Sequence, residues 1–309
     1  MLDYAKMYHG DTALSRLYQG DELIWEKGAP APSYDETRIS VVLLDWNDKP
    51  TDNVTYFETI ADSAAYLKDD SSNRYLVHIG SDSGITSLAA AAFSGCVNLI
   101  LIDIPDTITS LGGSAFYGCG LKTVTVPSSI SVIASSTFDT CTSLESVDLP
   151  NGITSIEMYA FYECSALESI NIPSTVTNIA EYAFERCSSI KSITVPVGVS
   201  LINSRVFRDC TNLESVILLG NVTSLGYSAF DGCTSLSSIA IPNTVTGIAP
   251  HAFDGCTSLE SITIPSSVTY IGEYAFQTSS LTTITVNKPE NGISGAPWGA
   301  TNARVIWTG

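Results

Sequence analysis

The stretch "AFDGCTSLESITIPSSVTYIGEYAF", residues 252–276, begins and ends on Ala-Phe, and its two phenylalanines lie 23 residues apart. Phenylalanine recurs at this interval along most of the chain, with a single step of 22 residues, and a cysteine follows three residues after each of the first eight. A fixed period of this length is typical of a solenoid, in which each coil contacts only its neighbours. The phenylalanines are Phe93, Phe116, Phe138, Phe161, Phe184, Phe207, Phe230, Phe253 and Phe276, and the cysteines are Cys96, Cys119, Cys141, Cys164, Cys187, Cys210, Cys233 and Cys256.

The letters of one coil predict which side chains point inward. In "LESITI", Leu259, Ile262 and Ile264 are expected to be buried, because the last two alternate with polar residues at strand spacing. The proline that follows cannot donate to a ladder and marks the end of the strand. Val268 and Ile271 form a second inward pair, and Phe and Cys three residues apart fit one turn of helix. A single coil cannot bury all of these side chains, so the coils are expected to stack.

The signature AF-x-x-C…L-x-x-I-x-I-P-x-x-V-T-x-I resembles the BspA-like class of leucine-rich repeat, in nine copies over residues 84–287. The resemblance implies a right-handed, β-rich leucine-rich-repeat solenoid with a parallel sheet on its concave face and short helical turns or irregular segments on the other. It also implies a bacterial surface or secreted protein that acts in adhesion and protein binding, without a shared catalytic site. Three positions depart from the pattern: Leu219 replaces the proline, Val206 the alanine, and Ser279 the ninth cysteine.

Both ends of a solenoid need a cap, because a terminal coil would leave its apolar side in water. Residues 36–83 are predicted to form an α/β N-terminal cap, since two strand-like runs flank the amphipathic stretch "YFETIADSAAYLKDD". Residues 288–309 are predicted to form a C-terminal cap that ends on the strand "RVIW", with Trp298 and Trp307 covering the last coil.

The first 30 residues contain two near copies, "MYHGDTALSRL" and "LYQGDELIWEK", each with Tyr-x-Gly-Asp. Because Gly-Asp marks a turn between strand-forming residues, this segment is predicted to be β-hairpin-like, and residues 31–35 to be a linker. It resembles the N-terminal attachment segments of phage and prophage tail-associated proteins over about residues 1–27. That resemblance implies attachment to a larger assembly through residues 1–30.

The chain carries 32 acidic and 14 basic residues, a net charge of −18. This charge argues against nucleic acid or an anionic membrane as a partner, because both would repel it. No apolar run is long enough to span a bilayer, so no membrane insertion is expected. We see no signal peptide in the first residues, and the BspA-like resemblance nevertheless favours an extracellular-facing location, on a cell surface, secreted or on a virion.

All eight cysteines occupy one column of the repeat. Coils about 4.8 Å apart would permit disulfides between neighbours, but the shared inward position favours a ladder of reduced, buried thiols. A zinc site is disfavoured, because no C-x-x-C pair occurs. No metal and no cofactor is expected.

Catalysis finds no support in the sequence, and we expect no enzyme activity. His9, His78 and His251 lie in separate segments, and none of the common catalytic or nucleotide-binding motifs is present. The acidic stretch "DWNDKPTDN", residues 45–53, is compatible with a calcium site or with a solvated loop, but it lacks the ligand order of an EF-hand.

Two surfaces are candidates for binding. The strand face carries small hydroxyl residues, with an acidic region that turns apolar along the stack. The other surface is a row of tyrosines beside the phenylalanines, which suit an interface because their rings are large and amphipathic. The strand-face candidates are Asp103, Asp148, Asn171, Thr194 and Ile217, and the tyrosines are Tyr159, Tyr182, Tyr227 and Tyr274.

The leading hypothesis is a non-enzymatic recognition or adhesion module that binds a protein or glycan ligand on a cell surface through the solenoid. The alternative is a structural or receptor-binding protein of a phage or prophage tail.

Overall fold

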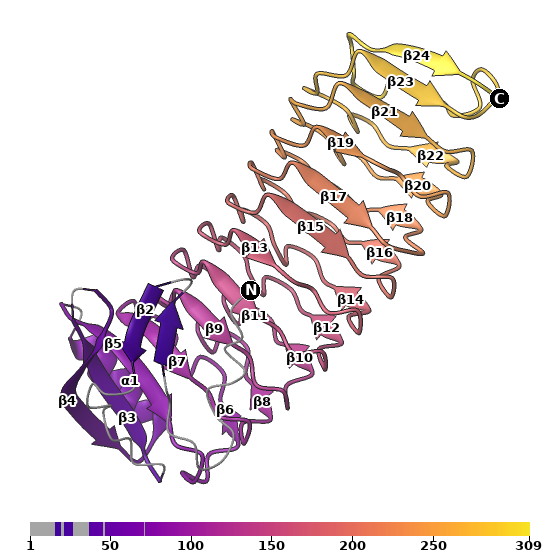
Figure 1. Ribbon diagram of the computed structural model, residues 1–309. Coiled ribbons are helices and arrows are strands. Elements are labelled where there is room, and N and C mark those ends of the chain that lie inside the picture. The colour runs from indigo at the N-terminus through magenta and orange to yellow at the C-terminus, as the bar shows by residue number, and fades with distance from the viewer. Residues whose placement is uncertain (1–15, 20–21, 27–36, 46, 71) are drawn as a thin grey trace.

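The computed structural model describes residues 16–19, 22–26, 37–45, 47–70 and 72–309. Most of this length is a leucine-rich-repeat solenoid, a stack of about ten coils that rises from a small α/β unit at one end to a closing strand at the other (Figure 1). The elements follow from the period of the sequence, because each coil repeats the same strand, turn and strand.

The α/β unit precedes the first coil and shares a sheet with it. β3 pairs antiparallel with β4 on one side and with β5 on the other, and β5 pairs parallel with β7 of the solenoid. One continuous sheet therefore runs from the unit into the coils. The elements are β3 (Ile39–Leu44), β4 (Pro50–Phe57), α1 (Ile60–Asp69), β5 (Arg74–Ile79) and β7 (Leu99–Asp103).

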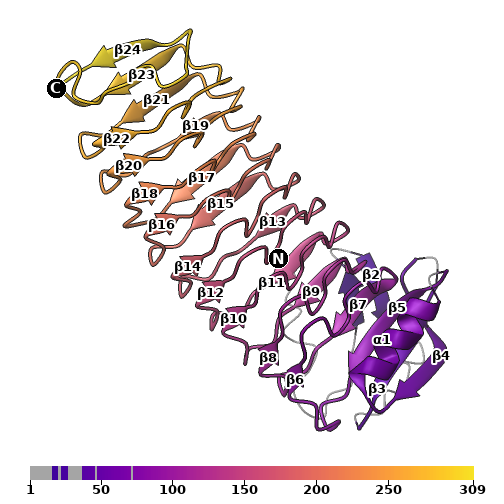
Figure 2. The same cartoon turned by 180° about the vertical axis from the view of Figure 1, so that it is seen from behind.

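Helix α1 covers one face of this sheet, as the view from behind shows (Figure 2). It begins after Thr59, whose hydroxyl oxygen accepts a hydrogen bond from the amide of Asp62, an N-cap that satisfies one of the free amides of the first turn. Two of its own side chains, Ala64 and Leu67, are buried. Within the described residues, no helix has the length and apolar character required to cross a membrane.

Polar contacts fasten the α/β unit to the coils. The buried carboxylate of Asp48, in the loop between β3 and β4, forms an ion pair with Arg74 and contacts the Lys122 ammonium of the second coil at 2.5 Å. The side-chain amide of Asn98 donates to the carbonyl of Leu67 at 2.8 Å. These bonds attach the α/β unit to the first coils of the stack.

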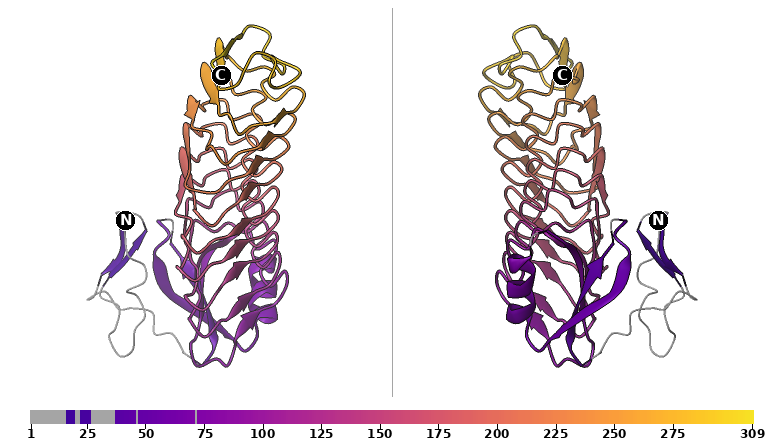
Figure 3. Two further views of the ribbon diagram at one scale, coloured as in Figure 1. Left: turned by 90° about the vertical axis from the view of Figure 1, so that its right-hand side faces the viewer. Right: turned by 90° about the vertical axis from the view of Figure 1, so that its left-hand side faces the viewer.

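Two columns of parallel strands run along the solenoid, and they lie on different sides of its cross-section (Figure 3). Neighbouring strands pair in register at the repeat interval, as in Ser146 with Ser169. Besides β7, the first column contains β9 (Thr123–Thr125), β11 (Ser146–Asp148), β13 (Ser169–Ile170), β15 (Ser192–Val195), β17 (Ser215–Leu218), β19 (Ser238–Ile239), β21 (Ser261–Ile264), β23 (Thr283–Val286) and β24 (Arg304–Trp307). The second contains β6 (Ser87–Leu88), β8 (Ser110–Leu111), β10 (Val132–Ile133), β12 (Ser155–Ile156), β14 (Asn178–Ile179), β16 (Leu201–Ile202), β18 (Ser224–Leu225), β20 (Gly247–Ile248) and β22 (Tyr270–Ile271).

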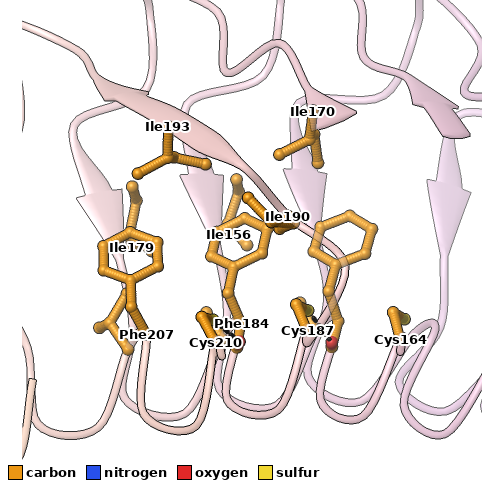
Figure 4. Packing of buried hydrophobic residues seen from close by; sticks show 14 of the residues in the cluster. Ile156, Cys164, Ile170, Ile179, Phe184, Cys187, Ile190, Ile193, Phe207 and Cys210 are labelled. Carbon is orange, nitrogen blue, oxygen red and sulfur yellow. Dashed lines mark hydrogen bonds between the residues drawn. The ribbon is translucent and has the colours of Figure 1, made fainter. Parts of the chain in front are cut away.

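The phenylalanines stack through the centre of the coils. Consecutive rings have their centroids 5.3 to 5.8 Å apart and are within 14° of parallel, and all nine side chains are fully buried. In the central coils, Phe184 and Phe207 lie over one another between the strand residues and the cysteines (Figure 4). The repeat of the sequence therefore becomes a repeat in space.

The segment that carries Phe and Cys differs in detail from the predicted turn of helix. Alternate amides bond in different directions: Phe116 donates to the carbonyl of Thr137 in the next coil, whereas Ala115 and Cys119 donate to carbonyls three residues earlier. An α-helix would direct every amide to the carbonyl four residues before it. The structure instead has consecutive turns, because half of the amides are used to bond the neighbouring coil.

The cysteines form no disulfide, and all eight are buried thiols. From Cys119 to Cys256, each thiol lies 3.0 to 3.2 Å from the phenylalanine carbonyl of the preceding coil, to which it donates. Burial raises the pKa of Cys96 to about 11 and that of Cys141 to about 12. The thiols therefore remain protonated at neutral pH.

The C-terminal end is closed by two tryptophans and a strand. β24 pairs parallel with β23, and the buried Trp298 packs edge-on against Phe276 with ring centroids 6.3 Å apart. Trp307 packs in the same way against Trp298, at 6.4 Å. At the other end, β1 (Arg16–Gln19) and β2 (Glu22–Glu26) pair antiparallel on either side of the second Gly-Asp. Residues 7–15 of the first unit and the predicted linker 31–35 lie outside the described residues.

Replacing Phe184 with alanine is expected to lower the free energy of unfolding by about 3–5 kcal/mol, because the cavity would lie between two stacked rings in the middle of the solenoid. Urea denaturation followed by circular dichroism measures the loss. The matched control is Tyr270→Ala, at a side chain 54% exposed, which should change stability by no more than about 0.5 kcal/mol. Equal effects of the two substitutions would contradict a Phe-centred core.

The eight thiols are expected to resist a thiol-specific reagent such as Ellman's reagent in the folded protein at pH 8, because the reactive thiolate is disfavoured by burial. Unfolding in guanidinium should release all eight at once. Prompt reaction of any thiol without denaturant would show that its column is open to solvent.

Candidate functional site

The tyrosine row is part of a longer feature that we call the aromatic ridge. Five of its members occupy the position two residues before the phenylalanine of their coil, and the sixth, Tyr227, lies one position earlier in its coil. The ridge consists of Tyr159, Tyr182, Arg205, Tyr227, His251 and Tyr274. Arg205 and His251 were not predicted as binding residues, although the repeat places them at the same position as the tyrosines.

Each member of the ridge contacts the next. The rings of Tyr159 and Tyr182 stack with centroids 4.6 Å apart. The guanidinium carbon of Arg205 lies 5.5 Å from the centroids of both Tyr182 and Tyr227, so it sits between two aromatic rings. His251 continues the row, 5.7 Å from Tyr227 and 5.4 Å from Tyr274. The result is one continuous column of aromatic and cationic side chains across six coils.

The backbone is in the left-handed region at five of the six positions of the ridge. The φ angles are 58° at Tyr159, 62° at Tyr182, 56° at Arg205, 58° at His251 and 59° at Tyr274. Side chains other than glycine and asparagine cost about 1 kcal/mol or more there. At five of its six positions the ridge therefore carries bulky residues where the backbone favours glycine, whereas in the coil of Tyr227 the left-handed residue is its neighbour Ser228, at a φ of 51°.

Other left-handed positions of the repeat are filled differently. The first three coils carry Ala91, Ser114 and Ser136 at the position of the ridge. Two residues after the phenylalanine, where φ is again positive, four coils carry glycine: Gly95, Gly118, Gly232 and Gly255. The bulky residues of the ridge are thus not a requirement of the fold, since neighbouring coils form the same turn without them.

Beside the ridge lies a row of ion pairs. Arg186 contacts Glu163 at 2.5 Å and Asp209 at 3.6 Å. Arg208 contacts Asp231 and Glu185, each at 3.1 Å. In this row, every arginine is shared between two carboxylates from the coils before and after it.

Glu185 is the most enclosed member of this row, with 3% of its surface exposed. Burial raises its pKa, and the neighbouring arginines oppose the shift. The pKa of Asp231 is also raised, chiefly by burial. Glu185 is thus buried, whereas Asp231 is only half-buried, and both are paired with Arg208.

The predicted strand-face residues do not form a comparable cluster. The carboxylate of Asp103 lies 2.5 Å from Nδ1 of the buried His78, so it joins the α/β unit to the first coil. Asp148, Asn171 and Thr194 are exposed on successive coils of the first column. Apart from the bond of Asp103 to His78, no bond between side chains links the predicted residues within the described part of this face.

Ile217 belongs to a small apolar region on the strand face. It is 54% exposed, and Leu219 and Val197 beside it are 52% and 55% exposed. Leu219 stands where the repeat predicts proline, and its amide donates to the carbonyl of Val195 at 3.0 Å. A proline could not make this bond, so the substitution lengthens the ladder between these two coils.

The remaining candidate chemistry is dispersed. His78 and His251 lie in different parts of the fold, and His9 falls outside the described residues. Asp45 accepts bonds from the amides of Asn47 and Lys49, and Asp48 is paired with basic side chains. Across residues 37–309, except for the undescribed positions, no group of three His, Cys, Asp or Glu side chains has the geometry to hold a metal ion.

Comparison with known proteins agrees with the repeat of the sequence. A family model described as BspA type leucine rich repeat region matches residues 71–191 and 177–296. No match was found among the curated proteins.

Among solved structures, the chain is similar to a leucine-rich repeat protein from Bacteroides ovatus ATCC 8483, with 24% identity over 73% of this chain and 76% of that one, and a TM-score of 0.40. It is also similar to a leucine rich cell surface protein from Faecalibacterium prausnitzii A2-165, with 27% identity over 67% and 78% of the two chains and a TM-score of 0.36. A leucine rich repeat protein from T. pallidum shows 27% identity over 60% and 82%, with a TM-score of 0.44.

Tyr274→Gly is expected to leave the protein about 1 kcal/mol more stable than Tyr274→Ala, because the left-handed backbone of this position suits glycine. The two free energies of unfolding in urea test this order. The same pair of substitutions at Tyr270, in strand β22, should give the opposite order. If Tyr274→Gly proves less stable than Tyr274→Ala, the backbone at position 274 carries no such strain.

Proposed function

The chain belongs to the family of BspA-type leucine-rich repeat proteins, and on that basis we propose that it is a non-enzymatic recognition or adhesion module. It acts on the outside of a cell and binds a protein partner through the aromatic ridge. The observation that carries this proposal is the continuous column of large side chains on a turn that does not need them.

The composition of the ridge suits a protein interface. Tyrosine and arginine are enriched among the residues that contribute most to binding energy between proteins. Tyr227 and Tyr274 are 42% and 50% exposed, so they offer surface that the core does not use. Their contacts within the ridge also limit side-chain motion, which reduces the entropy lost on binding.

A protein partner is favoured over a glycan by how the rings are used. The rings of Tyr159 and Tyr182 cover each other, and Arg205 covers a face of both Tyr182 and Tyr227. A sugar ring packs flat against an open aromatic face, and the sides on which these rings face each other and Arg205 are already occupied within the ridge. Tyrosine combines an apolar ring with a hydroxyl group, which suits the mixed polar and apolar surface of a protein.

The strand face is the weaker candidate surface. It is lined by serine and threonine, which seldom anchor an interface, and its exposed apolar region is limited to a few residues around Ile217. The tail-protein alternative depends on residues 1–30, and the family match, which begins at residue 71, does not extend to them. We therefore retain the recognition module alone.

Substituting Tyr182, Tyr227 and Tyr274 with serine is expected to weaken binding to the cell-surface partner at least tenfold, because each ring should contribute on the order of 1 kcal/mol. Binding of the labelled protein to bacterial and host cells can be measured by flow cytometry. Treating the cells with protease should abolish the signal, whereas removing their glycans should leave it unchanged.

The matched control carries the same number of substitutions on the strand face: Asp148→Ser, Asn171→Ser and Ile217→Ser. It should bind as the unaltered protein does. If the strand-face variant loses binding and the ridge variant keeps it, the assignment of the surface is wrong.

A further inference from the structure

Arg205 differs from the other two arginines of the turn segments in how its guanidinium is used. Arg186 and Arg208 are each held by two carboxylates at distances of 2.5 to 3.6 Å. Among the residues that the structure describes, the Arg205 side chain makes cation–π contacts with Tyr182 and Tyr227 and interacts electrostatically with Glu185, but it forms no hydrogen bond or ion pair. Its five N–H donors therefore have no protein acceptor in the described chain.

The guanidinium of Arg205 is nevertheless held in place. It lies 5.5 Å from the ring centroids of both Tyr182 and Tyr227, which is within the range of a cation–π contact on each side. Its backbone is fixed in the left-handed region at a φ of 56°. A planar group held between two rings has little freedom of movement, so less side-chain entropy is lost when a ligand binds.

We propose that Arg205 is the anchor of the ridge and binds a carboxylate of the protein partner, either an Asp or Glu side chain or a C-terminus. The inference rests on the proposed function and specifies the chemistry of that surface. A carboxylate matches the paired donors of a guanidinium in a bidentate arrangement, which is stronger and more directional than a bond to a neutral acceptor. Tyr182 and Tyr227 would flank the bound group.

The charges around Arg205 are compatible with this ligand. The nearby carboxylates of Glu163, Glu185, Asp209 and Asp231 are paired with Arg186 or Arg208. The chain as a whole carries a net charge of −18, which would repel a strongly acidic partner. The carboxylate is therefore a local anchor on a partner surface that is otherwise neutral or basic.

The test uses the full chain labelled with ¹⁵N at arginine and titrated with N-acetyl-glutamate N-methylamide, whose side-chain carboxylate is its only charge, with the neutral N-acetyl-glutamine N-methylamide as the matched probe. The Nε–H resonance of Arg205, assigned with Arg205→Lys, should shift saturably with the acid and not with the amide. The resonances of Arg186 and Arg208 should stay in place, because their donors are occupied. A third titration with glucuronate distinguishes a glycan carboxylate from a protein one.

Three results would overturn the inference: no saturable shift at Arg205, an equal shift with the neutral N-acetyl-glutamine N-methylamide, or binding of glucuronate at least tenfold tighter than that of N-acetyl-glutamate N-methylamide. A further comparison uses the cell-surface partner. Arg205→Lys keeps the charge and loses the planar fork, so it should weaken partner binding at least tenfold, whereas Arg186→Lys should not. If Arg205→Lys binds normally while the tyrosine variant does not, the anchor is rejected and the ridge remains the binding surface.

Discussion

Ring-on-ring packing of phenylalanine at the spacing of the coils is the constraint on which the other features depend. Because each buried ring contacts the ring before and after it, every coil must present phenylalanine at the same height and in the same orientation. The strands, the thiols and the turns then follow at fixed positions. From Cys119 onward, each cysteine in this column donates to a carbonyl of the preceding coil, since both lie in the dry interior. The same repetition aligns surface residues. Side chains at one position of the repeat therefore form a continuous row in space, even where they differ from coil to coil.

The sequence was sufficient to predict the solenoid, because a period of 23 residues with fixed apolar positions allows few other ways to bury them. The coil of 22 residues shows the limits of that freedom. Its missing residue falls beside Gly120, where an added β-carbon would lie 2.0 Å from the carbonyl oxygen of Val97. The shortened coil is therefore possible because a glycine allows the backbone to approach so closely. The turn conformation was less predictable, since Phe and Cys three residues apart fit a helical turn as well as consecutive turns that bond the next coil.

Only part of the candidate site could be predicted from the sequence. The four tyrosines could be found from their shared position, but a row of tyrosines does not reveal whether the gaps between them are filled. That depends on the side-chain direction of Arg205 and His251, which the sequence presents as two unrelated exceptions. The contact of Asp103 with His78 was likewise hidden, because it joins the α/β unit to the first coil. In both cases, contacts between neighbouring strands or coils decided whether a side chain was available to a partner.

The absence of ridge residues from the first three coils has a mechanical consequence. Ala91, Ser114 and Ser136 carry the same turn without adding to the ridge, so these coils separate the α/β unit from the row that begins at Tyr159. Each coil adds about 4.8 Å of height. The first three coils thus work as a spacer whose length can change only by whole coils. Gain or loss of one such coil would move the ridge farther from or nearer to the α/β unit and would leave the contacts within the ridge unchanged.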